Sequence, residues 1–230
     1  MKGIPTKDLR NLAVIGHGAC GKTSLCEALL FTAGAIKTLG TVEARNTVMD
    51  FEPEEAERRK SLSAGFASLA WKKHGVHLVD TPGDSNFIEE ARSVLQVLDG
   101  ALLVISAVSG VEPQTEKIWS HARRLGIAGL AFVNMMDREN ADFDRAVSGM
   151  EEALGVKAVP LQIPLGAGES FRGVIDLVEG KAYVYADASG KFRTEDIPAD
   201  LAGRAGAARK EMLESIAEAN DDLIEKYLEG

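Results

Sequence analysis

The sequence of 230 residues is poor in cysteine and has no long hydrophobic run. Cys20 and Cys26 are its only cysteines; they lie close together in a segment whose pattern predicts a loop entering a helix, which favours two reduced thiols over a disulfide. No apolar segment approaches the ~20 residues that a membrane-spanning helix needs. The first ten residues, MKGIPTKDLR, lack the hydrophobic core of a signal peptide. We therefore expect a cytoplasmic protein that does not bind membranes.

The sequence also has fewer positive than negative residues: 26 Lys and Arg and 35 Asp and Glu give a net charge of −9. Broad, sequence-independent binding to nucleic acid depends on many Lys and Arg contacts to phosphate. The composition argues against such binding, and we expect no direct DNA binding. A large ribonucleoprotein remains possible as a partner, since one face of an acidic protein can be basic. The only tight basic cluster is Arg58-Arg59-Lys60, either a contact patch or a solvated loop edge.

Four short apolar runs, rich in branched residues, are typical of strands buried on both faces: 12–15, 76–79, 101–105 and 130–133. Helical patterns lie between them at 22–31, 84–98 and 113–125. This alternation predicts an α/β fold with a mostly parallel sheet and helices on both of its faces. Ligands of such folds bind at the carboxyl ends of the strands.

Residues 62–80 depart from this alternation. Two apolar segments, 62–71 and 76–80, are joined by a short polar turn that ends in Gly75, which predicts a hairpin and one antiparallel strand at the sheet. The preceding residues 37–61 carry many charges and little periodicity. They are expected to form a long loop, and long loops in compact domains are usually functional or mobile.

After about residue 157 the pattern changes to short predicted strands at 159–163, 173–177 and 182–185. A single helix from about 198 to 228 is expected to follow. Its apolar stripe consists of Met212, Ile216, Ala219, Leu223 and Tyr227. We expect one domain over residues 1–157 and a smaller inserted α+β subdomain over 158–230.

Residues 16–23, GHGACGKT, fit the pattern G-x-x-x-x-G-K-[ST] between a predicted strand and a predicted helix. In this P-loop motif, backbone N–H groups and a helix N-terminus converge on phosphate, Lys22 reaches the outer phosphates and the Thr23 hydroxyl binds Mg²⁺. The candidate nucleotide-binding residues here are Gly16, His17, Gly18, Ala19, Cys20, Gly21, Lys22, Thr23 and Ser24. The loop alone does not distinguish ATP from GTP, or a hydrolase from a small-molecule kinase.

A second motif, DTPG at 80–83, follows the apolar run 76–79. A carboxylate at this strand end, Asp80, can hold Mg²⁺ through water, and the N–H of Gly83 can sense a γ-phosphate. A plain Pro-Gly turn is the alternative interpretation. The phosphate-binding motif upstream favours the functional one.

A third motif, NMMD at 134–137, resembles the N-K-x-D signature of GTP-binding proteins. Asp137 can accept two hydrogen bonds from the N1–H and amino group of guanine, which adenine cannot supply. GTP and GDP are therefore the preferred nucleotides, with Asn134, Met135 and Asp137 at the base. Met135 stands where the signature has Lys; its stem can pack on a ring face but brings no cation.

The stretch FVNMMDRENADF at 132–143 is similar, nearly residue for residue, to its counterpart in elongation factor G, and residues 197–230 resemble the end of that family's inserted subdomain. The resemblance covers essentially the whole chain. It implies a translational GTPase domain that uses GTP or GDP and Mg²⁺, with the ribosome as partner of the full-length protein. In that family a Ser-Ala motif after the inserted subdomain completes the guanine site. None follows here, so the GTP-binding domain is expected to lack its C-terminal segment.

Three residues depart from the pattern of that family. The family's first switch carries R-G-I-T-I, whose Thr ligates Mg²⁺, and RRKSL at 58–62 puts Ser61 in its place as the expected ligand. Asp84 replaces the His of D-T-P-G-H that positions the attacking water. Beside a γ-phosphate an anionic carboxylate is unfavourable unless it is protonated or compensated. Ala19 replaces the usual Asp of the phosphate loop, and together the three make the chain resemble divergent elongation factor G-like paralogues.

The leading hypothesis is a GTPase in which the catalytic candidates are Lys22, Gly83 and Asp84, and the metal ligands are Thr23, Ser61 and Asp80. GTP hydrolysis would drive a ribosome-linked conformational switch. The alternatives are a GTP-binding switch module with little or no hydrolysis, and a ribosome-protection or release-type relative. A P-loop kinase is disfavoured, because Asn134 and Asp137 would have no role in one.

Overall fold

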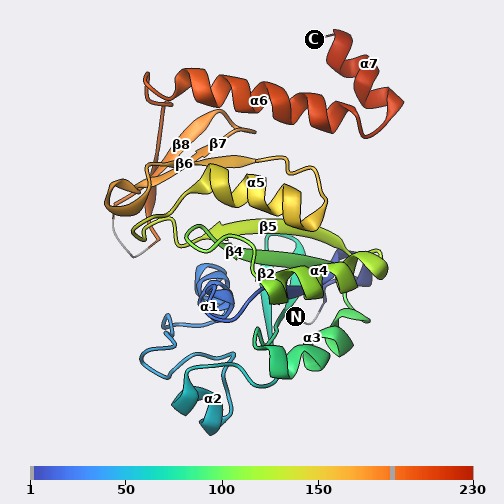
Figure 1. The fold of residues 1–230 in the computed structure, drawn as a ribbon, viewed down its shortest axis with the longest axis vertical. Helices are drawn as coiled ribbons and strands as arrows, with labels where there is room; N and C mark the ends of the chain where they lie inside the picture. Colours follow the sequence, from blue (N-terminus) through green and yellow to red (C-terminus); the bar gives the residue numbers. More distant parts are fainter. Residues whose placement is uncertain (1–2, 187–189, 230) are drawn as a thin grey trace.

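The computed structural model describes residues 3–186 and 190–229, which build two β-sheets (Figure 1). The five-stranded sheet has the order β2-β3-β1-β4-β5. Its strands are β1 (Leu9–Ile15), β2 (Gly65–Trp71), β3 (His74–Asp80), β4 (Gly100–Ser106) and β5 (Ala128–Asn134). All neighbours pair in parallel except β2, which runs antiparallel to β3. The mostly parallel sheet and the hairpin are confirmed.

Helices cover both faces of this sheet, because its central strands are apolar on both sides. On one face, Ile15 and Leu103 pack with α3 (Ile88–Leu95), α4 (Pro113–Arg124) and α5 (Phe143–Leu154). On the other, Val14 and Val104 pack with α1 (Lys22–Thr32) and with Met49. The carboxyl ends of β1 and β3 are thereby held rigidly beside the start of α1.

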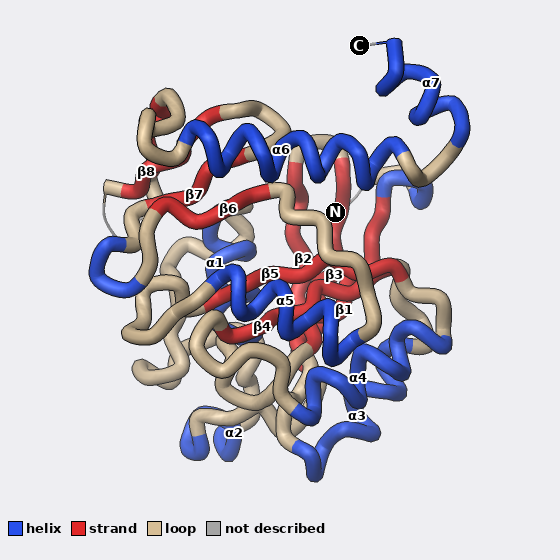
Figure 2. The backbone as a smooth tube through the Cα atoms, turned by 45° about the horizontal axis from the view of Figure 1, so that its top comes forward, coloured by secondary structure: helices blue, strands red, loops and turns tan. Residues whose placement is uncertain are grey.

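The second sheet is antiparallel, with the strand order β6-β7-β8-β9. These strands are β6 (Gln162–Leu165), β7 (Gly173–Asp176), β8 (Lys181–Tyr185) and β9 (Phe192–Glu195). Helix α6 (Ala202–Ala217) lies across this sheet in Figure 2 and buries Ala205 and Met212 against it. Helix α5 lies between the two sheets in Figure 1 and contributes residues to both cores.

The structure corrects several predicted boundaries. The single helix expected over 198–228 is two helices: α6 ends at Ala217, α7 (Asp221–Glu229) follows, and the Asn220 side chain accepts the N–H of Leu223 at the start of α7. The strand expected at 159–163 is β6, which begins only at Gln162 and extends to Leu165. Strand β9 was missed because its residues are all exposed and leave no apolar pattern.

Short helices were also missed. The expected loop 37–61 contains α2 (Pro53–Arg58), which starts with a proline and a capping box between Glu52 and Glu55. The helix predicted at 84–98 opens as a 3₁₀ turn, η2 (Ser85–Phe87), and ends at Leu95. The remaining 3₁₀ turns are η1 (Thr6–Asp8) and η3 (Gly168–Ser170). Over 3–186 and 190–229, no helix has the length and apolar character to cross a membrane.

Candidate nucleotide-binding site

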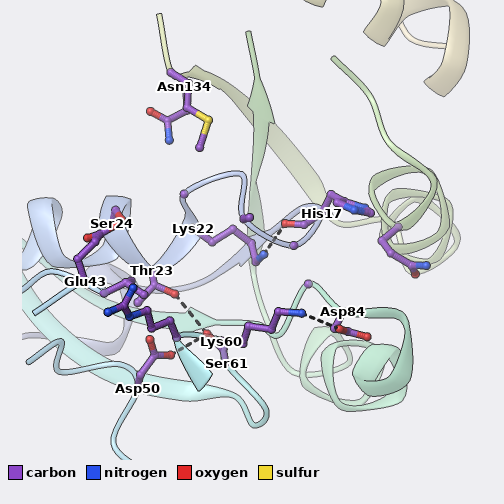
Figure 3. A pocket seen from close by; sticks show the side chains of 18 of the residues that line it. His17, Lys22, Thr23, Ser24, Glu43, Asp50, Lys60, Ser61, Asp84 and Asn134 are labelled. Carbon is purple, nitrogen blue, oxygen red and sulfur yellow. Dashed lines mark hydrogen bonds and ion pairs between the residues drawn. The ribbon is translucent and has the colours of Figure 1, made fainter. Parts of the chain in front are cut away.

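A cavity of about 710 Å³ opens beside the carboxyl ends of β1, β3 and β5 (Figure 3). Five segments far apart in the sequence line it: the loop before α1 with the first turn of that helix, the stretch 42–61, the loop after β3, the start of α4 and the loop after β5. The predicted site residues in its wall are His17, Gly18, Ala19, Gly21, Lys22, Thr23, Ser24, Ser61, Gly83, Asp84, Asn134, Met135 and Asp137. The other three, Gly16, Cys20 and Asp80, lie behind the wall. The three sequence motifs therefore converge on one site.

The phosphate loop depends on glycine at two positions. A Cβ on Gly16 would meet the carbonyl oxygen of Val104 at 2.5 Å, and one on Gly21 would collide with the side-chain amide of Asn134. Gly21 also has φ 94°, a left-handed conformation that turns the chain into α1 and that glycine adopts without strain. The Asn134 amide donates to the carbonyl of Cys20 at 2.9 Å, so the loop after β5 is bonded to the phosphate loop.

Lys22 is almost fully buried and its ammonium lies along the phosphate loop. Its Nζ donates to the carbonyl oxygen of His17 at 2.8 Å (Figure 3). The loop after β3 packs directly on this group, because a Cβ on Gly83 would meet Lys22 Nζ and would lie 2.6 Å from Gly18 N. Only glycine at position 83 lets that loop reach the phosphate loop.

Two hydroxyls and two carboxylates meet beside Lys22. Thr23 Oγ1 donates to Asp80 Oδ2 at 2.5 Å, and Ser61 Oγ donates to Asp50 Oδ1 at 2.7 Å. Thr23 Oγ1 and Ser61 Oγ lie 3.3 Å apart, a hydrogen bond in which either can be the donor, so four oxygen-bearing side chains gather at one point. Such a cluster of oxygens suits a hard cation.

Asp80 fits the same conclusion. Its side chain is 1% exposed, and within the described residues its Oδ1 has no hydrogen-bond partner. Burial, more than any neighbour, raises the pKa of its carboxyl to about 7. The donor set of Thr23, Ser61 and Asp80 therefore suits a hard divalent cation such as Mg²⁺, which prefers oxygen ligands. Asp50 was missed from sequence, because nothing in its own segment shows that it meets Ser61.

Buried carboxylates also anchor the stretch that carries Ser61. Glu55 is fully buried and accepts the N–H groups of Leu62 and Ser63 at 2.8 and 2.9 Å. Glu27 on α1, equally buried, accepts the N–H of Val48. In the sequence Glu27 looks like a surface residue of the predicted helix 22–31 and Glu55 like a charge in the predicted loop 37–61, so they too were missed.

Asp84 lies at the mouth of the cavity and is not isolated. It accepts the N–H of Asn86 at 3.0 Å, and its Oδ2 lies 3.7 Å from Lys60 Nζ (Figure 3). The Asn86 N–H, together with Lys60, holds the pKa of the Asp84 carboxyl below its usual value. Of the two possibilities that the sequence left open, a protonated or a compensated carboxylate, the structure shows compensation.

The base end of the site is more open. Asn134 and Met135 are half-buried, whereas the side chain of Asp137 is 69% exposed, with Oδ2 4.0 Å from Arg138 Nε. Met135 has φ 62°, an uncommon value for a residue other than glycine, which marks a sharp turn after β5. The Asp137 carboxylate is free to accept hydrogen bonds from a ligand.

The motifs that line this cavity also occur in a known family of proteins. Residues 7–228 match the family model of the elongation factor Tu GTP-binding domain. The chain belongs to this family. Elongation factor G of Salinibacter ruber (strain DSM 13855 / M31) is 41% identical over 230 residues, which cover 99% of this chain and 33% of that protein. The predicted resemblance to elongation factor G is thereby confirmed.

A solved structure has the same fold as this chain. The crystal structure of a protein from Thermus thermophilus matches this GTP-binding domain with a TM-score of 0.89 and 38% sequence identity, covering 96% of this chain and 33% of that one. The chain therefore spans about a third of the length of the relatives that it matches. The P-loop α/β fold predicted from the motifs is confirmed at this level of similarity.

Proposed function

We propose that this domain binds GTP and GDP with Mg²⁺ and hydrolyses GTP, as the nucleotide-binding part of an elongation factor G-like translational GTPase. The observation that carries the proposal is the pair of hydroxyls, Thr23 and Ser61, whose oxygens converge beside the buried carboxylate of Asp80. They lie next to a glycine-dependent phosphate loop and a buried lysine. This combination suits a metal-bound nucleotide triphosphate.

Each part of the site has a role in this proposal. The backbone N–H groups of 16–24 cradle the phosphates and Lys22 neutralises charge on the outer ones. Mg²⁺, held by Thr23, Ser61 and Asp80, supplies charge stabilisation at the transferring phosphoryl group. The N–H of Gly83 reports on the γ-phosphate. Asn134, Met135 and Asp137 hold the guanine.

The wider context is part of the same proposal. We propose that residues 1–157 form the GTP-binding domain and 158–230 an inserted subdomain, with the ribosome as partner of the full-length protein in the cytoplasm. The free edge of β5 carries the exposed side chains Leu130 and Phe132, which supports a further segment completing the sheet beside the guanine site.

A second candidate function is a switch module that binds GTP and scarcely hydrolyses it. It is favoured by one observation: the group at the position of the expected catalytic histidine is an ionised, lysine-paired Asp84. Such a carboxylate is a poor match for a water-positioning imidazole. Turnover decides between the two candidates.

The test begins with binding. Titrations of the purified protein with fluorescent GDP, competed with GTP and ATP, are expected to show strong preference for the guanine nucleotides; equal affinity for ATP would refute the assignment. Asp137→Asn should weaken GDP binding by about tenfold or more, since hydrogen bonds to a charged group contribute about 1.5–3 kcal/mol each. Glu139→Gln, an exposed neighbour, is the matched control.

Turnover is then measured with and without ribosomes. Ribosome-stimulated release of phosphate supports the GTPase. Tight GTP binding with no stimulated turnover, together with activity restored by Asp84→His, supports the switch module instead.

A further inference from the structure

Two residues that depart from the family pattern meet each other in space. Lys60 stands in the segment RRKSL, where the family has an apolar residue in R-G-I-T-I, and Asp84 stands in place of the histidine. They come from different sides of the cavity, Lys60 from the stretch after α2 and Asp84 from the loop after β3, and form an ion pair of 3.7 Å (Figure 3). Nothing in the sequence alone indicates that these two residues form a pair.

The pair lies at the phosphate end of the cavity. Asp84 directly follows Gly83, which packs on Gly18 and on the ammonium of Lys22, and Lys60 directly precedes Ser61 of the proposed metal site. Both Lys22 and Lys60 line the cavity. A nucleotide that occupies it will therefore meet two ammonium groups at its phosphates.

The two ammonium groups differ in freedom. Lys22 is 6% exposed and bonded within the phosphate loop, so it is available to any bound phosphate. The Lys60 side chain is 67% exposed and its contact with Asp84 is longer than a hydrogen bond. Ion pairs this exposed contribute little. A doubly charged γ-phosphate is a stronger partner for an ammonium group than one carboxylate, and the Lys60 side chain already lines the cavity.

Asp84, by contrast, is fixed. The N–H of Asn86 holds its carboxylate at the start of η2, so Lys60 is the movable partner of the pair. From this we infer that Lys60 contributes, beside Gly83, to distinguishing GTP from GDP: its ammonium transfers from Asp84 to the γ-phosphate of GTP, and Asp84 is a positioning residue that keeps it at the cavity. The inference rests on the proposed binding of guanine nucleotides.

The transfer also accounts for the carboxylate at position 84. Alone, the Asp84 carboxylate would repel a γ-phosphate. Paired with Lys60, it holds an ammonium group at the cavity, and this group moves from the carboxylate to the γ-phosphate when GTP binds. GDP has no γ-phosphate to offer Lys60, so the pair with Asp84 stays intact. GTP therefore gives the stretch that carries Lys60 and Ser61 a contact with the nucleotide that GDP does not give.

The test compares dissociation constants for GDP and for a non-hydrolysable GTP analogue, both with Mg²⁺. Lys60→Met is expected to weaken binding of the analogue about fivefold to tenfold, as for loss of one partly exposed charge-assisted hydrogen bond, and to change GDP binding less than about twofold. Lys60→Arg should retain the preference. Asp84→Asn should strengthen binding of the analogue relative to GDP, because the competing carboxylate charge is gone.

The matched control is Lys157→Met, which removes an exposed lysine from an ion pair with Glu218, 2.7 Å long, far from the cavity in the sequence. It should change neither constant. Equal weakening of GDP and analogue by Lys60→Met would show a structural role only and overturn the inference, as would unchanged binding of both. Failure of the unmodified protein to bind GDP is a separate result that overturns the proposed function as well.

Discussion

Glu55 offers the sharpest test of how the stretch before β2 is held. Its buried carboxylate accepts the N–H groups of Leu62 and Ser63 at 2.8 and 2.9 Å. Hydrogen bonds to a charged group contribute about 1.5–3 kcal/mol and neutral ones about 0.5–1.5 kcal/mol. Glu55→Gln keeps an acceptor but removes the charge, so it should cost about 1 kcal/mol per bond, or about 2 kcal/mol for the two.

This loss should appear as local opening and not as global unfolding, because the hydrophobic cores lie elsewhere. Since 1.4 kcal/mol is a factor of ten, about 2 kcal/mol predicts amide exchange at Leu62 and Ser63 about 30-fold faster than in the unmodified protein. Hydrogen–deuterium exchange followed by NMR or by short peptides covers both amides. Glu57→Gln, an exposed residue of the same helix, is the control.

The result that would refute the reasoning is equal protection of Leu62 and Ser63 in Glu55→Gln and in Glu57→Gln. The stretch would then be held by something other than the Glu55 carboxylate. Faster exchange across the whole five-stranded sheet would also contradict it, because that pattern means global destabilisation.

Three further predictions follow from single groups. Gly83→Ala places a methyl group against Gly18 and Lys22, so overpacking of about 1–3 kcal/mol should lower the melting temperature by about 2–4 °C per kcal/mol, and displacement of Lys22 should weaken GDP binding in a titration; unchanged values of both would contradict the close packing. Asp80→Asn should remove most of the Mg²⁺ dependence of GDP binding but leave binding in EDTA unchanged; retained dependence would place the metal elsewhere. Cys20 and Cys26 are buried, and burial raises the pKa of both thiols. Ellman's reagent at pH 8 should therefore label them at least about 100-fold more slowly in the native protein than in urea. Fast labelling of the native protein would contradict the fold.

The part of the site that could be predicted from sequence is the part made of short contiguous motifs. GHGACGKT carries its glycines, lysine and threonine within eight residues, so strand, loop and helix follow from local rules. Likewise, aliphatic runs identified β1, β3 and β4, because their buried residues leave a recognisable composition. The same kind of run identified β5, although Leu130 and Phe132 of that edge strand are exposed. The parallel pairing then brought the three motifs to one edge.

The rest depends on contacts between residues far apart in the chain. Glu27 and Glu55 are charged residues on helices, and only the packing of the 37–61 stretch against α1 and β2 turns them into buried acceptors. The pairing of Lys60 with Asp84 joins residues that are 24 positions apart in the chain. The break between α6 and α7 was missed because the apolar stripe continues through it, whereas the cap by Asn220 has no hydrophobic signature.

The same contrast explains why one half of the site can move while the other stays fixed. The phosphate loop joins β1 to α1, whose buried residues Val14, Cys26 and Leu30 belong to a hydrophobic core. The facing stretch, 42–61, contributes one buried apolar side chain to that core, Met49, and is otherwise held by polar contacts to carboxylates. Water can replace these hydrogen bonds when they break, whereas opening the apolar core would expose its side chains to water without compensation. That stretch should therefore open at lower cost than the phosphate loop, while Lys22 and Thr23 keep their places, which is the behaviour that a nucleotide-dependent switch requires.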